Sequence, residues 1–189
     1  MLEPRKNNVT DLSAVLSKVT GRSAADYARE KLFGPLGIAD VQWRSDPQGV
    51  STGGFGLSLQ PRDMAKLGYL WLHGGAWDGR QILPTEWLDK ARHATVPMGM
   101  DPLRYGNLFW SLPTQDIFMA VGYDRQLIVV MPGLDIVAVF TGARRYSDAN
   151  GVPSGPSYRF DAVLARLKAA VKSEAALPED AEGSAALAG

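Results

Sequence analysis

The stretch FMAVGYDRQLIVVMPGLDIVAVFTG, residues 118–142, decides how the rest of the chain is interpreted. Its two apolar, β-branched runs are joined by Pro132-Gly133, which predicts two antiparallel strands connected by a tight turn. A polar Tyr-Asp-Arg triplet interrupts the apolar pattern between Gly122 and Gln126. Two interpretations are open at this point: a β-bulge, or a strand whose backbone faces a substrate.

Short apolar runs of the same kind begin near residue 105. They are bounded by Pro, Gly or Asp, and their short connections predict an antiparallel meander. The runs are residues 105–112, 116–122, 126–131 and 134–142. Residues 157–176 then repeat apolar side chains at helical spacing, which predicts a C-terminal helix packed on the sheet. The small, polar residues 176–189 predict a disordered tail.

The first half of the chain is predicted to be helical. Apolar residues at helical spacing predict a first helix near 9–20, and Ser23 followed by Asp26 predicts the capped start of a second. These two helices form a helical hairpin. Two further helices begin at Pro61 and near Pro84, because proline favours the first helical position. Together with the meander, these elements predict an α/β (α+β) fold. The apolar residues of the first helix are Val9, Leu12, Leu16 and Val19.

Composition excludes several classes of function. The chain has 189 residues, enough for one domain, and its 20 basic and 20 acidic side chains give zero formal charge. A neutral chain does not favour nucleic acid or an anionic membrane as a partner. With no cysteine and only two histidines, neither a metal nor a cofactor is expected. The first residues lack the apolar run of a signal peptide, and no segment reaches membrane-spanning length.

One short motif suggests a nucleophile and is rejected. Gly49-Val50-Ser51-Thr52-Gly53 fits the pattern G-x-S-x-G. That pattern requires a strand before the serine and a helix directly after it. Here loop-forming residues precede Ser51, and the next predicted helix begins only at Pro61. His73 and His93 are both predicted at helix ends, where histidine commonly interacts with the last carbonyls.

The motif order resembles the serine β-lactamase and penicillin-binding-protein-like hydrolases, in their class C branch with its esterases and amide hydrolases. The resemblance covers residues 9–142. It is carried by LSAVLSKVTGRSAADYAREKLFGPLGI, GGFGLSLQPRDMAKLGYLWLHGGAWDGRQILPTEWL and MAVGYDRQLIVVMPGLDIVAVFTG. It implies a non-matching segment at residues 1–8 and the C-terminal part of the family's domain at residues 9–175.

The family's motifs match this sequence only in part. An acyl-serine mechanism is implied, with the nucleophile in S-x-x-K and a tyrosine in Y-x-N or Y-x-S. No serine here is followed by lysine three residues later, and the tyrosine's region holds residues 4–6, Pro-Arg-Lys. The third motif falls on Ala120-Val121-Gly122, which the resemblance implies is a substrate-facing edge strand. The amide of Tyr123 then completes the oxyanion hole, and Gln126 helps to shape the strand.

The resemblance therefore implies a C-terminal fragment that is inactive alone. Its origin is a truncated or frameshifted gene, an internal start, or a degenerate non-catalytic descendant. The expected partners are the missing N-terminal half and, in the complete enzyme, a small ester, amide or lactam. Ala120 replaces a cationic or imidazole residue, which favours an esterase or amide hydrolase over a β-lactamase, although Arg125 could supply the charge. The alternative is a non-catalytic binding or assembly module. Complete family members are often periplasmic or secreted.

Overall fold

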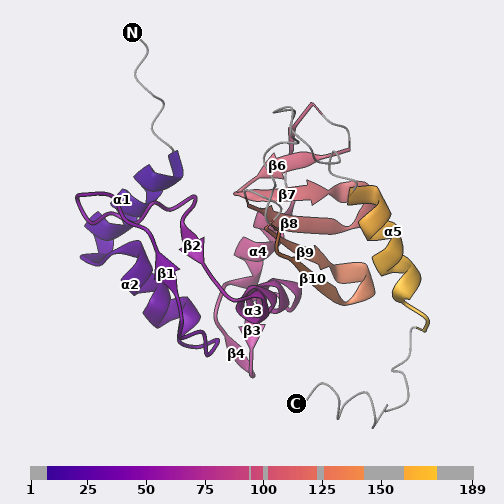
Figure 1. Ribbon diagram of the computed structural model, residues 1–189, viewed down its shortest axis with the longest axis horizontal. Coiled ribbons are helices and arrows are strands. Elements are labelled where there is room, and N and C mark those ends of the chain that lie inside the picture. The colour runs from indigo at the N-terminus through magenta and orange to yellow at the C-terminus, as the bar shows by residue number, and fades with distance from the viewer. Residues whose placement is uncertain (1–7, 94, 100–101, 123–125, 143–159, 174–189) are drawn as a thin grey trace, which may run out of the picture. The chain divides into compact units, whose positions relative to one another are not determined.

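In the computed structural model the chain divides into two compact units, Met1–Arg144 and Arg145–Gly189. The structure describes residues 8–93, 95–99, 102–122, 126–142 and 160–173. The described part of the first unit combines helices with an antiparallel sheet (Figure 1), and that of the second is the helix α5 (Phe160–Ala170) with the three residues after it. The predicted α/β class and the C-terminal helix are confirmed. No helix among the described residues is long and apolar enough to cross a membrane.

The main sheet is an antiparallel meander, as the sequence predicts, but it has six strands where four runs were predicted. Its spatial order, β10-β9-β8-β7-β6-β5, is the chain order in reverse, so each strand pairs with its neighbours along the chain. One run was wrongly predicted as a single strand: residues 105–112 reverse at Asn107 and Leu108, whose φ angles are 48° and 68°. The strands are β5 (Val96–Pro97), β6 (Arg104–Gly106), β7 (Phe109–Leu112), β8 (Ile117–Val121), β9 (Leu127–Met131) and β10 (Ile136–Phe140).

Two connections at one end of the sheet have the same conformation. Between β7 and β8, and again between β9 and β10, a 3₁₀ turn begins at a proline, as Pro113–Gln115 and Pro132–Leu134. Each turn closes on an aspartate in the left-handed region, Asp116 with φ 49° and Asp135 with φ 53°. Aspartate tolerates this conformation better than most residues. Because β8 starts from the first of these turns, its other end, at Gly122, lies at the opposite end of the sheet.

Helix α3 (Pro61–Leu72) packs on β9 and β10 through a glycine. Proline occupies the first helical position, as predicted, because its missing amide hydrogen is not needed there. A Cβ added to Gly68 would overlap Cγ1 of Val137 and lie 2.9 Å from Cγ2 of Ile128. Leu70, on the same helix, is fully buried. The buried core here consists of Phe33, Leu36, Ile38, Leu67, Leu70, Ala91, Phe109, Phe118, Ile128 and Val130.

The predicted helical hairpin is present at the start of the first unit. Helix α1 (Asn8–Thr20) is followed by α2 (Ala24–Ala28), which continues as a π-helical turn, Arg29–Phe33. The Ser23 side chain accepts a hydrogen bond from the Asp26 amide, as the capping pattern predicts. After the hairpin the chain enters the core, because Phe33, Leu36 and Ile38 are buried.

The predicted helix α1 carries exposed apolar side chains. Leu12 and Val19 are 59% and 80% exposed, whereas Leu16 is half-buried. Val15 is also exposed, at 58%, whereas Ser13 is buried. The helix therefore turns a polar face toward the rest of its unit. The side chain of Val9 lies outside the described residues.

The remaining elements of the first unit are short. Residues 39–60, predicted as irregular, contain one two-residue strand pair that the sequence did not predict. A second pair forms around the predicted turn at Asp78 and Gly79, and a short helix follows Pro84 as expected. These elements are β1 (Gln42–Trp43), β2 (Leu57–Ser58), β3 (Ala76–Trp77), β4 (Arg80–Gln81) and α4 (Thr85–Arg92).

Candidate functional site

At its C-terminal end, the backbone of β8 pairs with β9 but, among the described residues, no longer with β7. The first part of the strand is internal to the sheet, because it pairs with both β7 and β9. The ladder with β7 stops at the Trp110–Met119 pair, whereas the ladder with β9 continues to Val121 and Leu127. Pairing with β7 stops here because β7 begins only after the turn at Asn107 and Leu108, which connects it to β6. Ala120 and Val121 therefore pair on a single side within the described residues.

Backbone hydrogen bonding sets the direction in which this open segment points. The Gly122 amide donates to the Gln126 carbonyl oxygen at 2.7 Å, so Gly122 is directed toward the β9 side. Successive residues of an antiparallel strand point alternately to either side. The amide and carbonyl of Val121 therefore point away from β9, where pairing with β7 has ended. An extended ligand could form hydrogen bonds with a strand exposed in this way.

Gln126 connects the ends of three strands. Its carbonyl accepts the Gly122 amide at the end of β8, and its own position directly precedes β9. Its side-chain Nε2 donates to the carbonyl of Gly142, two residues beyond β10, at 2.5 Å. A Cβ added at Gly122 would lie 3.0 Å from the Gln126 Cβ. Gln126 is thus bonded within the protein, where it supports the shape of the β8 end.

The predicted site residues fall partly within the described structure. Ala120 and Val121 are half-buried, and Gly122 is exposed beside Gln126. Tyr123 and Arg125 lie outside the described residues, so the oxyanion role of the Tyr123 amide stays a prediction. The turn that opens the side of Val121 was missed, although Gly106-Asn107 is a dipeptide typical of hairpin turns.

Ser51 has a structural role that explains its burial. It is 2% exposed, and its hydroxyl accepts a hydrogen bond from the Ala25 amide at 3.1 Å, near the start of α2. Its backbone forms an isolated bridge to Ser45 within a loop. The strand and helix that a nucleophile elbow requires do not flank Ser51, and its oxygen is occupied. The structure therefore supports the rejection of G-x-S-x-G.

Both histidines lie at helix ends, as predicted. His73 follows α3, where its Nδ1 lies 3.0 Å from the Tyr69 carbonyl oxygen and its ring stacks on Tyr69 with centroids 3.9 Å apart. His93 follows α4 and contacts the Asp89 carbonyl in the same way. In the described residues neither ring is bonded to a carboxylate that would orient it as a general base.

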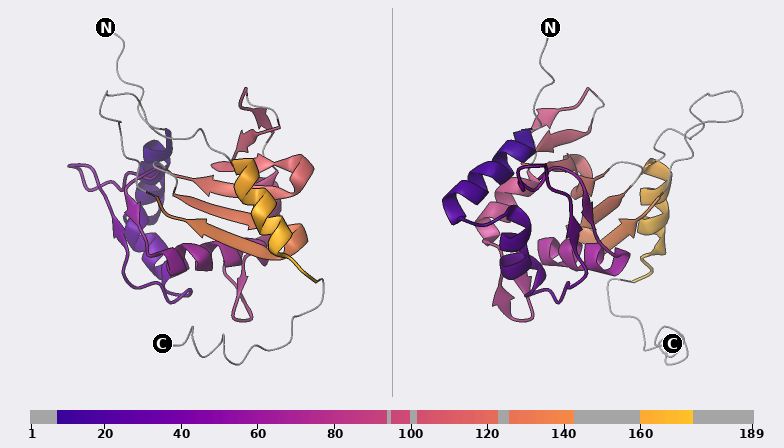
Figure 2. Two further views of the ribbon diagram at one scale, coloured as in Figure 1. Left: turned by 45° about the vertical axis from the view of Figure 1, so that its right-hand side comes forward. Right: turned by 60° about the vertical axis from the view of Figure 1, so that its left-hand side comes forward.

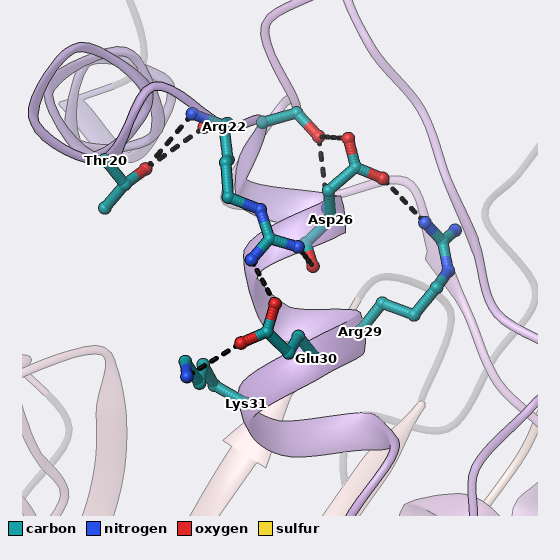
Figure 3. A network of polar contacts seen from close by, with 7 residues as sticks. Thr20, Arg22, Asp26, Arg29, Glu30 and Lys31 are labelled. Atoms are coloured by element: carbon teal, nitrogen blue, oxygen red, sulfur yellow. Dashed lines mark hydrogen bonds and ion pairs between the residues drawn. The ribbon is translucent and has the colours of Figure 1, made fainter.

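The groups with shifted pKa values among the described residues lie in the helical hairpin and not at β8 (Figure 3). Lys31 and Arg22 donate hydrogen bonds to Glu30, and these lower the pKa of its carboxyl to about 2. The hydrogen bond from Ser23, supported by Arg29, lowers the pKa of Asp26. All of these groups are on the surface. No cluster of His, Cys, Asp and Glu among the described residues could hold a metal ion.

Comparison with known proteins identifies similar sequences and folds. Residues 7–159 match the family named Beta-lactamase. The solved "Putative 6-aminohexanoate-dimer hydrolase from Bacillus anthracis" is similar with 22% identity and a TM-score of 0.69, over 89% of this chain and 43% of its own. A "putative beta-lactamase from Bacteroides dorei" has 16% identity and a TM-score of 0.53, over 74% of this chain and 49% of its own. No curated protein matches. The chain thus spans less than half of either solved protein.

Proposed function

The chain belongs to the beta-lactamase family, and we propose that it forms the substrate-binding C-terminal part of a serine hydrolase. The complete enzyme would hydrolyse a small ester, amide or lactam through an acyl-serine intermediate. The observation that carries this proposal is the open end of β8. There the backbone of Val121 has no pairing partner on the β7 side among the described residues, and the amide of Gly122 is already bonded to Gln126.

This strand end fits two requirements of acyl transfer. A substrate with a peptide-like backbone needs a partner for its amide and carbonyl groups, which Val121 can provide. The developing oxyanion needs a hydrogen-bond donor. Because the Gly122 amide is occupied, that donor has to come from a neighbouring residue. We assign this role to the amide of Tyr123, as the family resemblance implies.

The nucleophile is not supplied by this sequence. None of its serines precedes a lysine by three residues, and Ser51 is buried and hydrogen-bonded to α2. We therefore propose that the chain is a fragment and that the serine, its lysine and the tyrosine belong to another part of the domain. Removing a nucleophile or its base costs several orders of magnitude in rate, so the chain alone should be inactive.

The substrate is proposed to be a neutral ester or amide. Ala120 stands where the family resemblance places a cationic or imidazole side chain, so this position offers no charge to a substrate carboxylate. The Bacillus anthracis protein is named as a 6-aminohexanoate-dimer hydrolase, and an amide bond joins the two halves of such a dimer, which agrees with that class. We assign the related β-lactam and D-alanyl peptide substrates to other family members.

The proposal is tested by adding the missing part in trans. We expect background rates when the chain alone meets chromogenic ester, amide and lactam substrates, and no mass change with a covalent serine probe. The second component is the portion of the Bacillus anthracis protein that the shared fold leaves uncovered. Its addition should produce ester or amide hydrolysis. Stoichiometric labelling of Ser51 would contradict the proposal, as would a lack of hydrolysis in a complex shown to have formed.

A glycine substitution then locates the site. Gly122→Val places side-chain atoms against Gln126 and should disturb the neighbouring amide, costing about 2–4 kcal/mol of transition-state stabilisation, or ~30- to 1,000-fold in kcat/KM. Gly133→Val is the matched control, because this glycine lies in the turn at the opposite end of the sheet. Equal losses in both variants would show that Gly122 matters only for folding. Unchanged hydrolysis with retained ligand binding would instead favour a binding module.

A further inference from the structure

Three apolar side chains form an exposed line on α1. Leu12, Val15 and Val19 are 59%, 58% and 80% exposed, and we call them the α1 stripe. Their spacing of three and four residues places them on one helix face. Helix α1 lies at the margin of its unit in every view (Figures 1 and 2). Single exposed apolar residues are ordinary on a surface, but an aligned set on one helix face indicates contact with another element.

The opposite face of α1 is polar and is the one that faces the chain. Ser13 is only 6% exposed, and the Thr10 hydroxyl donates to the Thr52 carbonyl at 2.7 Å. The Ser17 and Thr20 hydroxyls bond back to carbonyls within the helix, at 2.9 and 2.8 Å. The helix is therefore attached to its unit by hydrogen bonds. Its hydrophobic side has no partner among the described residues.

Apolar exposure continues in the segment to which α1 is attached. Thr52 is followed by Phe55 and Leu57, which are 54% and 38% exposed. Other exposed apolar residues lie singly on separate elements, such as Val96 on β5 and Leu108 in the β6–β7 turn. The α1 stripe thus places three exposed apolar side chains on one face of one helix, and the segment bonded to α1 adds two more.

We propose that the α1 stripe is the docking surface for the part of the beta-lactamase domain that this sequence does not contain. This inference rests on the proposed function, in which that part carries the nucleophile. The shared fold takes up 89% of this chain but only 43% of the Bacillus anthracis protein. More than half of a related chain thus has no counterpart here, and in our proposal that part packs against the shared one. A helix that presents its apolar face outward fits such a neighbour, because the contact would remove that face from water.

Thiol labelling tests the surface directly, because the chain has no cysteine. Val15→Cys places a single thiol on the α1 stripe, and Val96→Cys places one at a matched valine, 55% exposed, on β5. Both thiols should react with a maleimide at similar rates in the chain alone. Adding the uncovered portion of the Bacillus anthracis protein should slow labelling at Val15→Cys by at least about tenfold and leave Val96→Cys unchanged.

Affinity provides a second measurement with the same partner. Val15→Ser should weaken binding of that portion by about tenfold, the effect of losing one buried valine side chain. Val96→Ser, the control, should bind as the unmodified chain does. Equal affinities for the Val15→Ser and unmodified chains would overturn the docking surface, even if both bind tightly.

Other occupants of the stripe give distinct results, and each would overturn the proposal. Protection of Val15→Cys in the chain alone that rises with concentration indicates a second copy. Protection that is independent of concentration and lost when residues 1–7 are deleted indicates the chain's own N-terminus. Absence of protection at saturating partner also rejects the surface. Protection of the thiol without hydrolysis would support the docking surface and contradict the proposed activity. Hydrolysis with an unprotected thiol would support the activity and contradict the docking surface.

Discussion

The sheet and α1 differ in how their apolar residues are used. All five residues of β9 are buried, and α3 lies close enough to the sheet that only glycine fits at position 68. In α1, Leu12, Val15 and Val19 face water, while Ser13 is buried. Both segments have apolar patterns that predicted the correct secondary structure. The difference shows that an apolar pattern predicts a helix or strand but not which of its faces the fold buries. For α1 we propose that the partner lies in another part of the domain.

The largest effect should come from the core beneath the sheet. Leu70→Ala removes a fully buried side chain from α3 and leaves a cavity, so the free energy of unfolding should fall by about 2–5 kcal/mol. Chemical denaturation of both chains measures this difference. A loss below about 1 kcal/mol would mean that the sheet side is no better packed than the α1 side.

Overpacking of the same contact should have a smaller effect. Gly68→Ala places a methyl group against Val137 and Ile128, so α3 has to shift away from the sheet. The free energy of unfolding should fall by about 1–3 kcal/mol. Gly133→Ala is the control, because its added Cβ would be 3.6 Å from the nearest atom, an ordinary contact. Similar losses at both glycines would indicate a general effect of glycine replacement.

The hydrogen bond that attaches the Ser51 loop to α2 should contribute less to the free energy of unfolding than either packing contact. Ser51→Ala removes the oxygen that accepts the Ala25 amide, which should lower the free energy of unfolding by about 1 kcal/mol. Hydrolysis by the complemented enzyme should be unchanged, because Ser51 is assigned no chemical role. Loss of turnover without loss of stability would restore G-x-S-x-G as the catalytic motif.

The α1 side should be nearly insensitive to substitution in the isolated chain. Val15→Ser changes an exposed side chain, so the free energy of unfolding should stay within about 0.5 kcal/mol of the unmodified value. This is the direct counterpart of Leu70→Ala, measured by the same denaturation. A loss above about 1.5 kcal/mol would show that α1 already has a partner within the chain.

Acid should weaken the helical hairpin slightly before it affects the sheet. The pKa of Glu30 is lowered from 4.5 to about 2 by Lys31 and Arg22. Because the folded-state pKa is the lower one, this contribution is complete above pH 4.5 and is lost as the pH falls toward 2. The effect should be the smallest of the five, since the pair is exposed and screened by solvent. Glu30→Gln should reduce the pH dependence of hairpin unfolding in this range, as measured by hydrogen exchange, and leave the part that Asp26 contributes.

Local patterns predicted most of the fold. The strands after residue 116 and the helix starts at Ser23 and Pro61 depend on nearby residues, so the sequence alone was sufficient to place them. The split at Asn107 was missed because the apolar residues on both sides resemble one continuous strand. The outward face of α1 could not be predicted, because burial depends on which partners are present. The open side of β8 depends on where β7 ends, so it became apparent only from strand pairing.

The order of strands in the sheet also has a kinetic consequence. Because β6 to β10 each pair with the next strand along the chain, the contacts between them close only short loops. Short loop closure has a low entropic cost and favours rapid folding. The meander should therefore form early and without help from the rest of the domain. Assembly of the complete enzyme would then be a later, concentration-dependent association of a folded sheet with its partner, whose rate can be measured separately from folding.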